Sequence, residues 1–205
     1  MLSGVMAFAF GVAVVLGIPI AFSLGLTALA TVFAWGEVPL TIIAQRMFGG
    51  MDSFPLLAVP FFILSGELMT QGGIMTKLVG FSNALVGHIR GGLAQVNVVG
   101  SMFSSGITGA GVADAAAIGS ILIPAMKREG YDLPFSAAVT AAAAVNGPII
   151  PPSIAMVIYS FAVGGTVSVA ALFAAGFVPG ILIGLALMAL NYVIATKKGY
   201  PVGVR

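Results

Sequence analysis

The sequence has 205 residues, of which 60% are hydrophobic and only 7% are charged, and its formal net charge is +2. An ordinary soluble domain carries roughly 25% charged residues, so this composition excludes a water-soluble protein and predicts an integral membrane protein with several spans. The absence of cysteine and the single histidine exclude disulfides and a histidine metal cluster, and so small a net charge does not indicate a nucleic-acid partner.

The N-terminal part of the chain predicts two short membrane spans. Residues 1–36 contain no charged side chain. As one helix they would be about 54 Å long, whereas the hydrocarbon core of a bilayer is about 30 Å thick. Proline and glycine in residues 17–22 permit a turn between two helices. The start has no basic region and no small-residue cleavage site, so we expect a first span rather than a removable signal peptide.

A polar connection and a third span are expected next. Glu37, Arg46 and Asp52 mark the connection, and residues 54–69 form the span.

Residues 72–92 predict an amphipathic helix. Its apolar residues recur at spacings of three and four, which places them on one helical face. They are Ile74, Leu78, Phe81, Leu85 and Ile89, with Lys77, His88 and Arg90 available to lipid headgroups. Two interpretations stay open, a helix lying along the membrane interface and a connecting helix packed on protein.

Residues 91–126 predict a helical hairpin that enters the membrane and returns. The segment is apolar except for Asp114, and "FSSGITGAG" (residues 103–111) interrupts it. Each leg would reach only about 20 Å, and basic residues flank both ends, as expected where both ends are cytoplasmic. Non-helical backbone at this depth is tolerated when it lines a cavity, so the tip predicts one. For Asp114 we consider a structural role at the helix dipole and a substrate or proton site.

The segment "NGPIIPPS" (residues 146–153) predicts a break within a spanning helix. Proline inside a helix costs roughly 3 kcal/mol, and this segment contains three prolines. We expect half-helices over residues 133–145 and 154–163, a turn at "GGTVS" (residues 164–168), and a last span over residues 169–196.

The distribution of basic residues supports this layout of five crossings and one hairpin. With the N-terminus outside, one basic residue of the 8, Arg46, falls outside, as the positive-inside rule expects. The cytoplasmic ones are Lys77, Arg90, Lys127, Arg128, Lys197, Lys198 and Arg205.

The two breaks together predict a site for a cation and an anion. Discontinuous membrane helices expose their N-termini toward anions and free carbonyl groups toward cations. Carbonyl groups of the break, with the side-chain oxygens of Asn146 and Ser153, suit a desolvated Na⁺. The hairpin tip offers the hydroxyls of Ser104, Ser105 and Thr108 from the other side. The alternatives are a simple proline kink and a plain tight turn.

Four motifs resemble one family. "PFFILSGELM", "GHIRGGLAQVNV", "GVADAAAIGSILIPAM" and "NGPIIPPSI" together resemble the large membrane subunit of tripartite ATP-independent periplasmic (TRAP) transporters, the DctM type, over nearly the whole chain. The resemblance implies an all-α polytopic protein of the bacterial inner membrane, similar to the ion transporter superfamily and of the elevator type. It implies Na⁺-coupled uptake of an organic acid such as a C4-dicarboxylate or sialic acid. The implied partners are a periplasmic solute-binding protein and a small four-helix membrane subunit.

The resemblance also implies site residues at the tip and the break. The implied Na⁺ ligands are Ser105, Gly106, Thr108, Gly109, Asn146, Gly147 and Pro148. The implied substrate-binding residues are Ser104, Ser105, Thr108, Pro151 and Ser153. The chain departs from the family pattern at the tip, where Ala110 replaces a common serine, and at Asn146, where a small or branched residue is common.

The resemblance covers the first of two inverted halves, with no second hairpin or second broken helix. The expected organisation is scaffold-type spans with an interfacial arm helix (1–90), the hairpin (91–128), the discontinuous helix (133–163) and the final span (167–196). We therefore expect a truncated or split chain that needs the second half of the large subunit for transport. The alternatives are a divalent-anion/Na⁺ symporter without a binding protein and a non-transporting membrane scaffold. We do not expect an enzyme, because no Ser/His or Asp/Asp pair has usable spacing.

Overall fold

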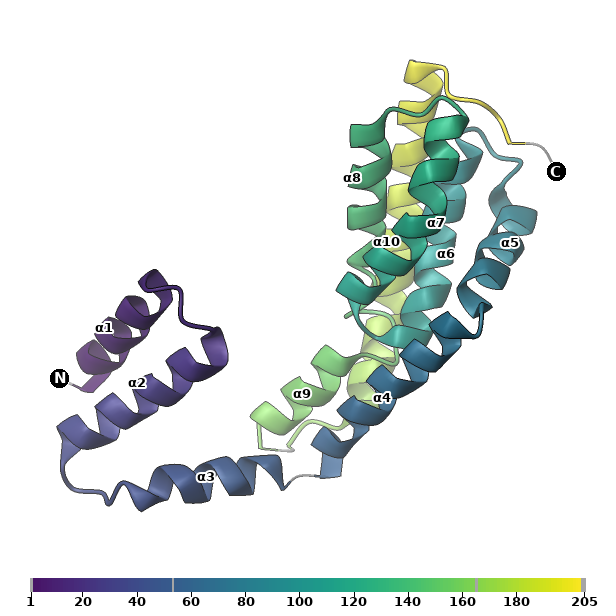
Figure 1. Cartoon of the computed structure of the whole chain (residues 1–205). Helices are drawn as coiled ribbons and strands as arrows, with labels where there is room; N and C mark the ends of the chain where they lie inside the picture. Colours follow the sequence, from purple (N-terminus) through teal and green to yellow (C-terminus); the bar gives the residue numbers. More distant parts are fainter. Residues whose placement is uncertain (1, 53, 165, 204–205) are drawn as a thin grey trace. The chain divides into compact units, whose positions relative to one another are not determined.

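The computed structural model describes residues 2–52, 54–164 and 166–203, with the backbone alone for residues 54–58. Gly165 of the predicted turn and Arg205 of the predicted cytoplasmic charges lie outside these residues. The described residues form helices and no strand, which confirms the all-α class (Figure 1). The helices are α1 (Leu2–Val15), α2 (Ile20–Trp35), α3 (Thr41–Met51), α4 (Phe54–Gln71), α5 (Ile74–Val86), α6 (Gly92–Thr108), α7 (Gly111–Arg128), α8 (Leu133–Ala144), α9 (Ile154–Ala162) and α10 (Val169–Lys198).

The chain separates into two compact units, with α1–α3 in the first and α4–α10 in the second. In the first unit α1 packs against α2, and the predicted turn lies between them, where Gly17 has a φ of 73°. The hydroxyl of Ser23 donates to the carbonyl of Ile18 at 3.0 Å and so closes this turn. The connection expected around Arg46 is helical over α3, because apolar residues of adequate helix propensity surround that single charge.

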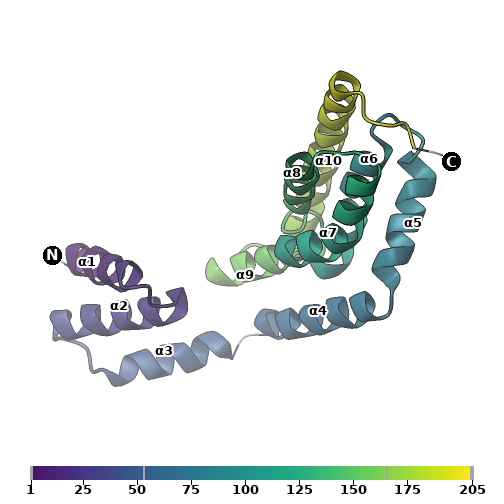
Figure 2. The same ribbon diagram turned by 45° about the horizontal axis from the view of Figure 1, so that its top comes forward.

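The second unit contains a bundle of α6, α7, α8 and α10, which lie side by side in both views (Figures 1 and 2). Helix α6 runs through the interior of this unit. Its buried residues include apolar ones such as Val96 and Val98 and polar ones such as Asn97 and Ser101. A central helix that buries polar side chains needs partners for them inside the protein.

Helix α5 packs on protein, against α6 and α7. Its packed face carries Met75, Val79 and Val86 together with Leu78 of the predicted apolar face, so the two faces overlap only in part. Phe81 and Leu85 of that predicted face remain exposed. The packing agrees with the interpretation of α5 as a helix packed on protein.

Helix α10 has 30 residues with a mean hydropathy of 2.3, and among the described residues it alone is long and apolar enough to cross a membrane by itself. The apolar helices α1, α2, α5 and α8 are shorter.

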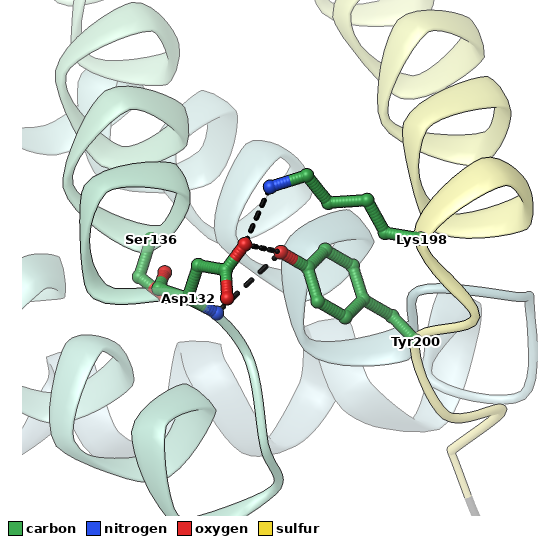
Figure 3. Close-up of polar contacts among 4 residues, drawn as sticks. All are labelled: Asp132, Ser136, Lys198 and Tyr200. Atoms are coloured by element: carbon green, nitrogen blue, oxygen red, sulfur yellow. Dashed lines mark hydrogen bonds and ion pairs between the residues drawn. The ribbon is translucent and has the colours of Figure 1, made fainter.

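The end of α10 is tied to the start of α8 by polar contacts (Figure 3). The carboxylate of Asp132 accepts hydrogen bonds from the Nζ of Lys198 and, at 2.8 Å, from the hydroxyl of Tyr200. The hydrogen bond from Lys198 is the main reason that the pKa of Asp132 is lowered from 3.8. The ring of Tyr200 packs against Tyr131, with centroids 4.5 Å apart and the rings tilted by 32°. These contacts fix the chain that follows α10 against the bundle.

Candidate functional site

The site begins at two interruptions of helical structure. Helix α6 ends at Thr108 and α7 starts at Gly111, so only Gly109 and Ala110 connect them. Gly109 has a φ of 62°, in the left-handed region that closes helices and favours glycine. The second interruption is the segment of residues 145–153 between α8 and α9, called the break below. The sequence predicted interruptions at residues 103–111 and 146–153; the first is shorter than predicted, because α6 stays helical to Thr108.

Backbone from the tip lies directly against backbone from the break. A Cβ atom added to Gly147 would lie 2.4 Å from the nitrogen of Gly111, and one added to Gly109 would lie 2.6 Å from the carbonyl oxygen of Pro152. The amide of Ile154 donates to the carbonyl of Gly109 at 3.4 Å. Only glycine permits such approaches. The fold therefore brings the predicted tip residues and the predicted break residues together.

Asn146 is the polar side chain of the break with the strongest signature of a ligand. It is 0% exposed, and neither its amide nitrogen nor its amide oxygen has a hydrogen-bond partner among the described residues. A buried amide without partners costs about 1–3 kcal/mol. Such a group is expected to meet a bound ion, water or ligand.

Ser153 has two hydrogen bonds within the break. Its hydroxyl donates to the carbonyl of Pro148 at 2.8 Å and accepts from the amide of Met156 at 3.2 Å. Ser153 is thus the N-cap of α9 and holds the break in shape. Pro151 lines an apolar cavity of about 600 Å³ together with Met102, Phe103 and residues of α10.

The tip hydroxyls converge on Asp114, in the first turn of α7. Thr108 donates to its Oδ1 at 2.7 Å, and Ser104 donates to the same oxygen. Ser105 lies 3.0 Å from Oδ2. Asp114, Ser104 and Ser105 are 0% exposed. The sequence analysis considered Asp114 alone and did not connect it with these hydroxyls.

Helix α10 contributes contacts that the sequence analysis missed. A Cβ added to Gly176 would lie 2.4 Å from the carbonyl oxygen of Ile149, and one added to Gly180 would lie 2.4 Å from the side chain of Ile150. The spacing of four residues between these glycines is the signal that could have revealed a close helix contact. Helix α10 therefore packs closely against the break.

Comparison with known proteins identifies the relatives of this chain. Residues 7–205 match the family model "Tripartite ATP-independent periplasmic transporter, DctM component". The sialic acid TRAP transporter permease protein SiaT of Haemophilus influenzae is 45% identical over 91% of this chain and 30% of its own length. The C4-dicarboxylate TRAP transporter large permease protein DctM of Rhodobacter capsulatus is 37% identical over 98% of this chain and 48% of its own length. The chain thus spans less than half the length of these relatives.

Proposed function

Because the chain belongs to the DctM family of tripartite ATP-independent periplasmic transporters, we propose that it is a permease part of a Na⁺-coupled uptake system for organic acids. It is not an enzyme. It works in the bacterial inner membrane with its N-terminus periplasmic and its C-terminus cytoplasmic. Its partners are a second half of the large subunit, a small four-helix membrane subunit and a periplasmic solute-binding protein.

The observation that carries this proposal is the contact between tip and break beside the amide of Asn146, for which the described part of the chain offers no hydrogen-bond partner. Helices α6 and α8 both end there, and the last carbonyl groups of a helix lack intrahelical donors. Carbonyl oxygens and the Asn146 amide oxygen are hard ligands of the kind that replace the hydration shell of an alkali cation. The residues present therefore fit Na⁺.

An organic anion fits the same place because two helices begin there. The N-termini of α7 at Gly111 and of α9 at Ile154 present the positive ends of two helix dipoles. The relatives are permeases for sialic acid and C4-dicarboxylates by name, so we propose a carboxylate substrate of this kind. The re-entrant course of α6 and α7 through the membrane is part of the same proposal.

Uptake into proteoliposomes tests the proposal. The chain is reconstituted with a matching second half, the small subunit and the binding protein, and radiolabelled sialic acid and C4-dicarboxylates are offered with or without a Na⁺ gradient. We expect uptake that requires Na⁺. Asn146→Ala should abolish most of it, whereas Asn83→Ala, which changes an exposed asparagine of α5, should leave it unchanged.

The other outcomes separate the alternatives. Uptake that proceeds equally without Na⁺ contradicts sodium coupling. Uptake that needs no binding protein favours a symporter of the divalent-anion type. If no component set supports uptake although the complex assembles, the chain is a scaffold.

A further inference from the structure

The hydroxyls of Ser104 and Thr108 and the backbone of Gly106 and Gly109 contact different parts of the structure. Successive residues of a helix are rotated by about 100°, so Ser104 and Thr108 share one face of α6. Gly106 lies on another, called the glycine face below, and Gly109 follows the helix as its C-cap. The contacts agree with this division. Thr108 lies against α4, where a Cβ added to Gly66 would be 3.7 Å from the methyl group of Thr108.

The glycine face is the one that meets the break. A Cβ added to Gly106 would lie 3.7 Å from the carbonyl oxygen of Pro151, and Gly109 meets Pro152. Ser104 points elsewhere, because its hydroxyl lies 3.4 Å from the sulfur of Met75 in α5. The break therefore faces backbone of the tip, and the hydroxyls of Ser104 and Thr108 face α4, α5 and Asp114.

Asp114 explains why these hydroxyls stay on that face. A carboxylate is an acceptor only, and each hydroxyl has one proton to donate. Ser104 and Thr108 both donate to Oδ1, and Ser105 divides its contacts between Oδ2 of Asp114 and the carbonyl of Ser101 at 2.7 Å. The carboxylate thus links the end of α6 to the start of α7.

We propose that Asp114 is a positioning residue that holds the tip closed through Ser104, Ser105 and Thr108, so that the tip offers main-chain groups and no hydroxyl to the ion. This inference rests on the proposed Na⁺ binding and refines its ligand set. The tip contributes carbonyl oxygens, and Asn146 contributes the side-chain ligand. Asp114 acts on the ion site by fixing where the tip backbone lies.

Thermal unfolding of the purified transporter complex, titrated with NaCl at constant ionic strength with choline chloride, tests this assignment. Each variant yields a melting temperature without Na⁺ and a half-saturating Na⁺ concentration. We expect Ser104→Ala and Thr108→Val to lower the melting temperature without Na⁺ and to change the half-saturating concentration by less than roughly threefold. Asn146→Ala should leave the melting temperature without Na⁺ nearly unchanged and should raise the half-saturating Na⁺ concentration at least roughly tenfold. A rise of this size is expected when a bound cation loses one of its ligands.

Conservative variants show that positioning is involved. Thr108→Ser keeps the donor and should retain the melting temperature and the Na⁺ response. Asp114→Asn keeps an acceptor oxygen for Ser104 and Thr108 but loses the acceptor of Ser105, so it should lower the melting temperature less than Asp114→Leu. Asp114→Leu keeps the volume and loses the acceptors, and should lower the melting temperature. It should also weaken Na⁺ binding, because the tip backbone is no longer held in place.

Two results would contradict the assignment. If Thr108→Val or Ser104→Ala raises the half-saturating Na⁺ concentration tenfold with an unchanged melting temperature without Na⁺, the hydroxyls are ligands and the inference is wrong. If the unmodified complex responds equally to Na⁺ and choline, the proposed function fails, and this inference fails with it.

Discussion

Gly147 of the break and Gly111 of the tip lie so close that a Cβ on Gly147 would stand 2.4 Å from the nitrogen and 2.5 Å from the Cα of Gly111. The contact is between backbone atoms of two helix ends that are 36 residues apart in the chain by number. No flexible side chain is available to move aside. The position of the break relative to the tip therefore depends on the absence of a side chain at residue 147.

Gly147→Ala tests this contact. Because backbone atoms must shift to admit the methyl group, we expect a lower melting temperature and a loss of most Na⁺-dependent uptake. Gly80→Ala is the matched control, since a Cβ there meets nothing within 4 Å, and alanine stabilises a helix interior by roughly 0.5–1 kcal/mol relative to glycine. If Gly147→Ala and Gly80→Ala have the same melting temperature and the same uptake rate, the contact between Gly147 and Gly111 has room for a methyl group and the prediction is wrong.

Ser153→Ala tests the N-cap of α9. The change removes the bonds to Pro148 and Met156, and loss of an N-cap typically costs about 1 kcal/mol. We expect reduced stability together with weaker Na⁺ binding, measured by unfolding at several Na⁺ concentrations. Ser168→Ala is the control, because it changes the N-cap of α10, whose hydrogen bond from the amide of Ala171 is longer at 3.5 Å. This variant should lose less stability than Ser153→Ala and should bind Na⁺ as the unmodified protein does. Unchanged Na⁺ binding in Ser153→Ala would separate this cap from the ion site.

Asn97 and Thr140 form a buried polar pair between α6 and α8, with the Nδ2 of Asn97 donating to the hydroxyl of Thr140 at 2.7 Å. Thr140→Val leaves the Asn97 amide without this partner, while its oxygen already has none among the described residues. We expect a cost of about 1–3 kcal/mol. The double variant Asn97→Leu/Thr140→Val should be less destabilised than the sum of the single variants, as a double-mutant cycle measures. Strict additivity would mean that the two side chains do not interact.

The contact of Asp132 with Lys198 predicts a pH dependence. Folding lowers the pKa of Asp132 from its ordinary 3.8, chiefly through the hydrogen bond from Lys198. A lowered pKa in the folded state contributes stability above the ordinary value, and the contribution is lost as the pH falls through the lowered pKa. Asp132→Asn should therefore be less stable than the unmodified protein at pH 7, and the two should converge below about pH 4. Melting curves over this pH range check the expectation.

High salt provides the control for this pair. The side chains of Asp132 and Lys198 are both about half exposed, and the Debye length falls to about 3 Å at 1 M salt. The difference in stability between Asp132→Asn and the unmodified protein at pH 7 should therefore be smaller at 1 M salt. A difference that persists at high salt would instead indicate that the hydrogen bond from Tyr200 dominates.

Composition and local pattern determined the class of the protein and the positions of its interruptions. Uninterrupted apolar sequence predicts helices, and the glycine-rich residues 103–111 and the proline-rich residues 146–153 predict approximately where helices end, because glycine and proline change the conformations open to the backbone. The motifs around them were specific enough to indicate the family. Even the ligand candidate Asn146 followed from its place inside the break.

The tertiary structure decided which groups face one another. The hydroxyls of Ser104, Ser105 and Thr108 were predicted to take part in the site, and in the fold all three contact Asp114. Ser104 also lies beside Met75 of α5, and Thr108 lies beside Gly66 of α4. Packing likewise exposes Phe81 and buries Met75 in α5. Local periodicity fixes the spacing of residues on a helix, but the partner that covers each face is set by packing between segments far apart in the chain. That packing made Asp114 the centre of the tip.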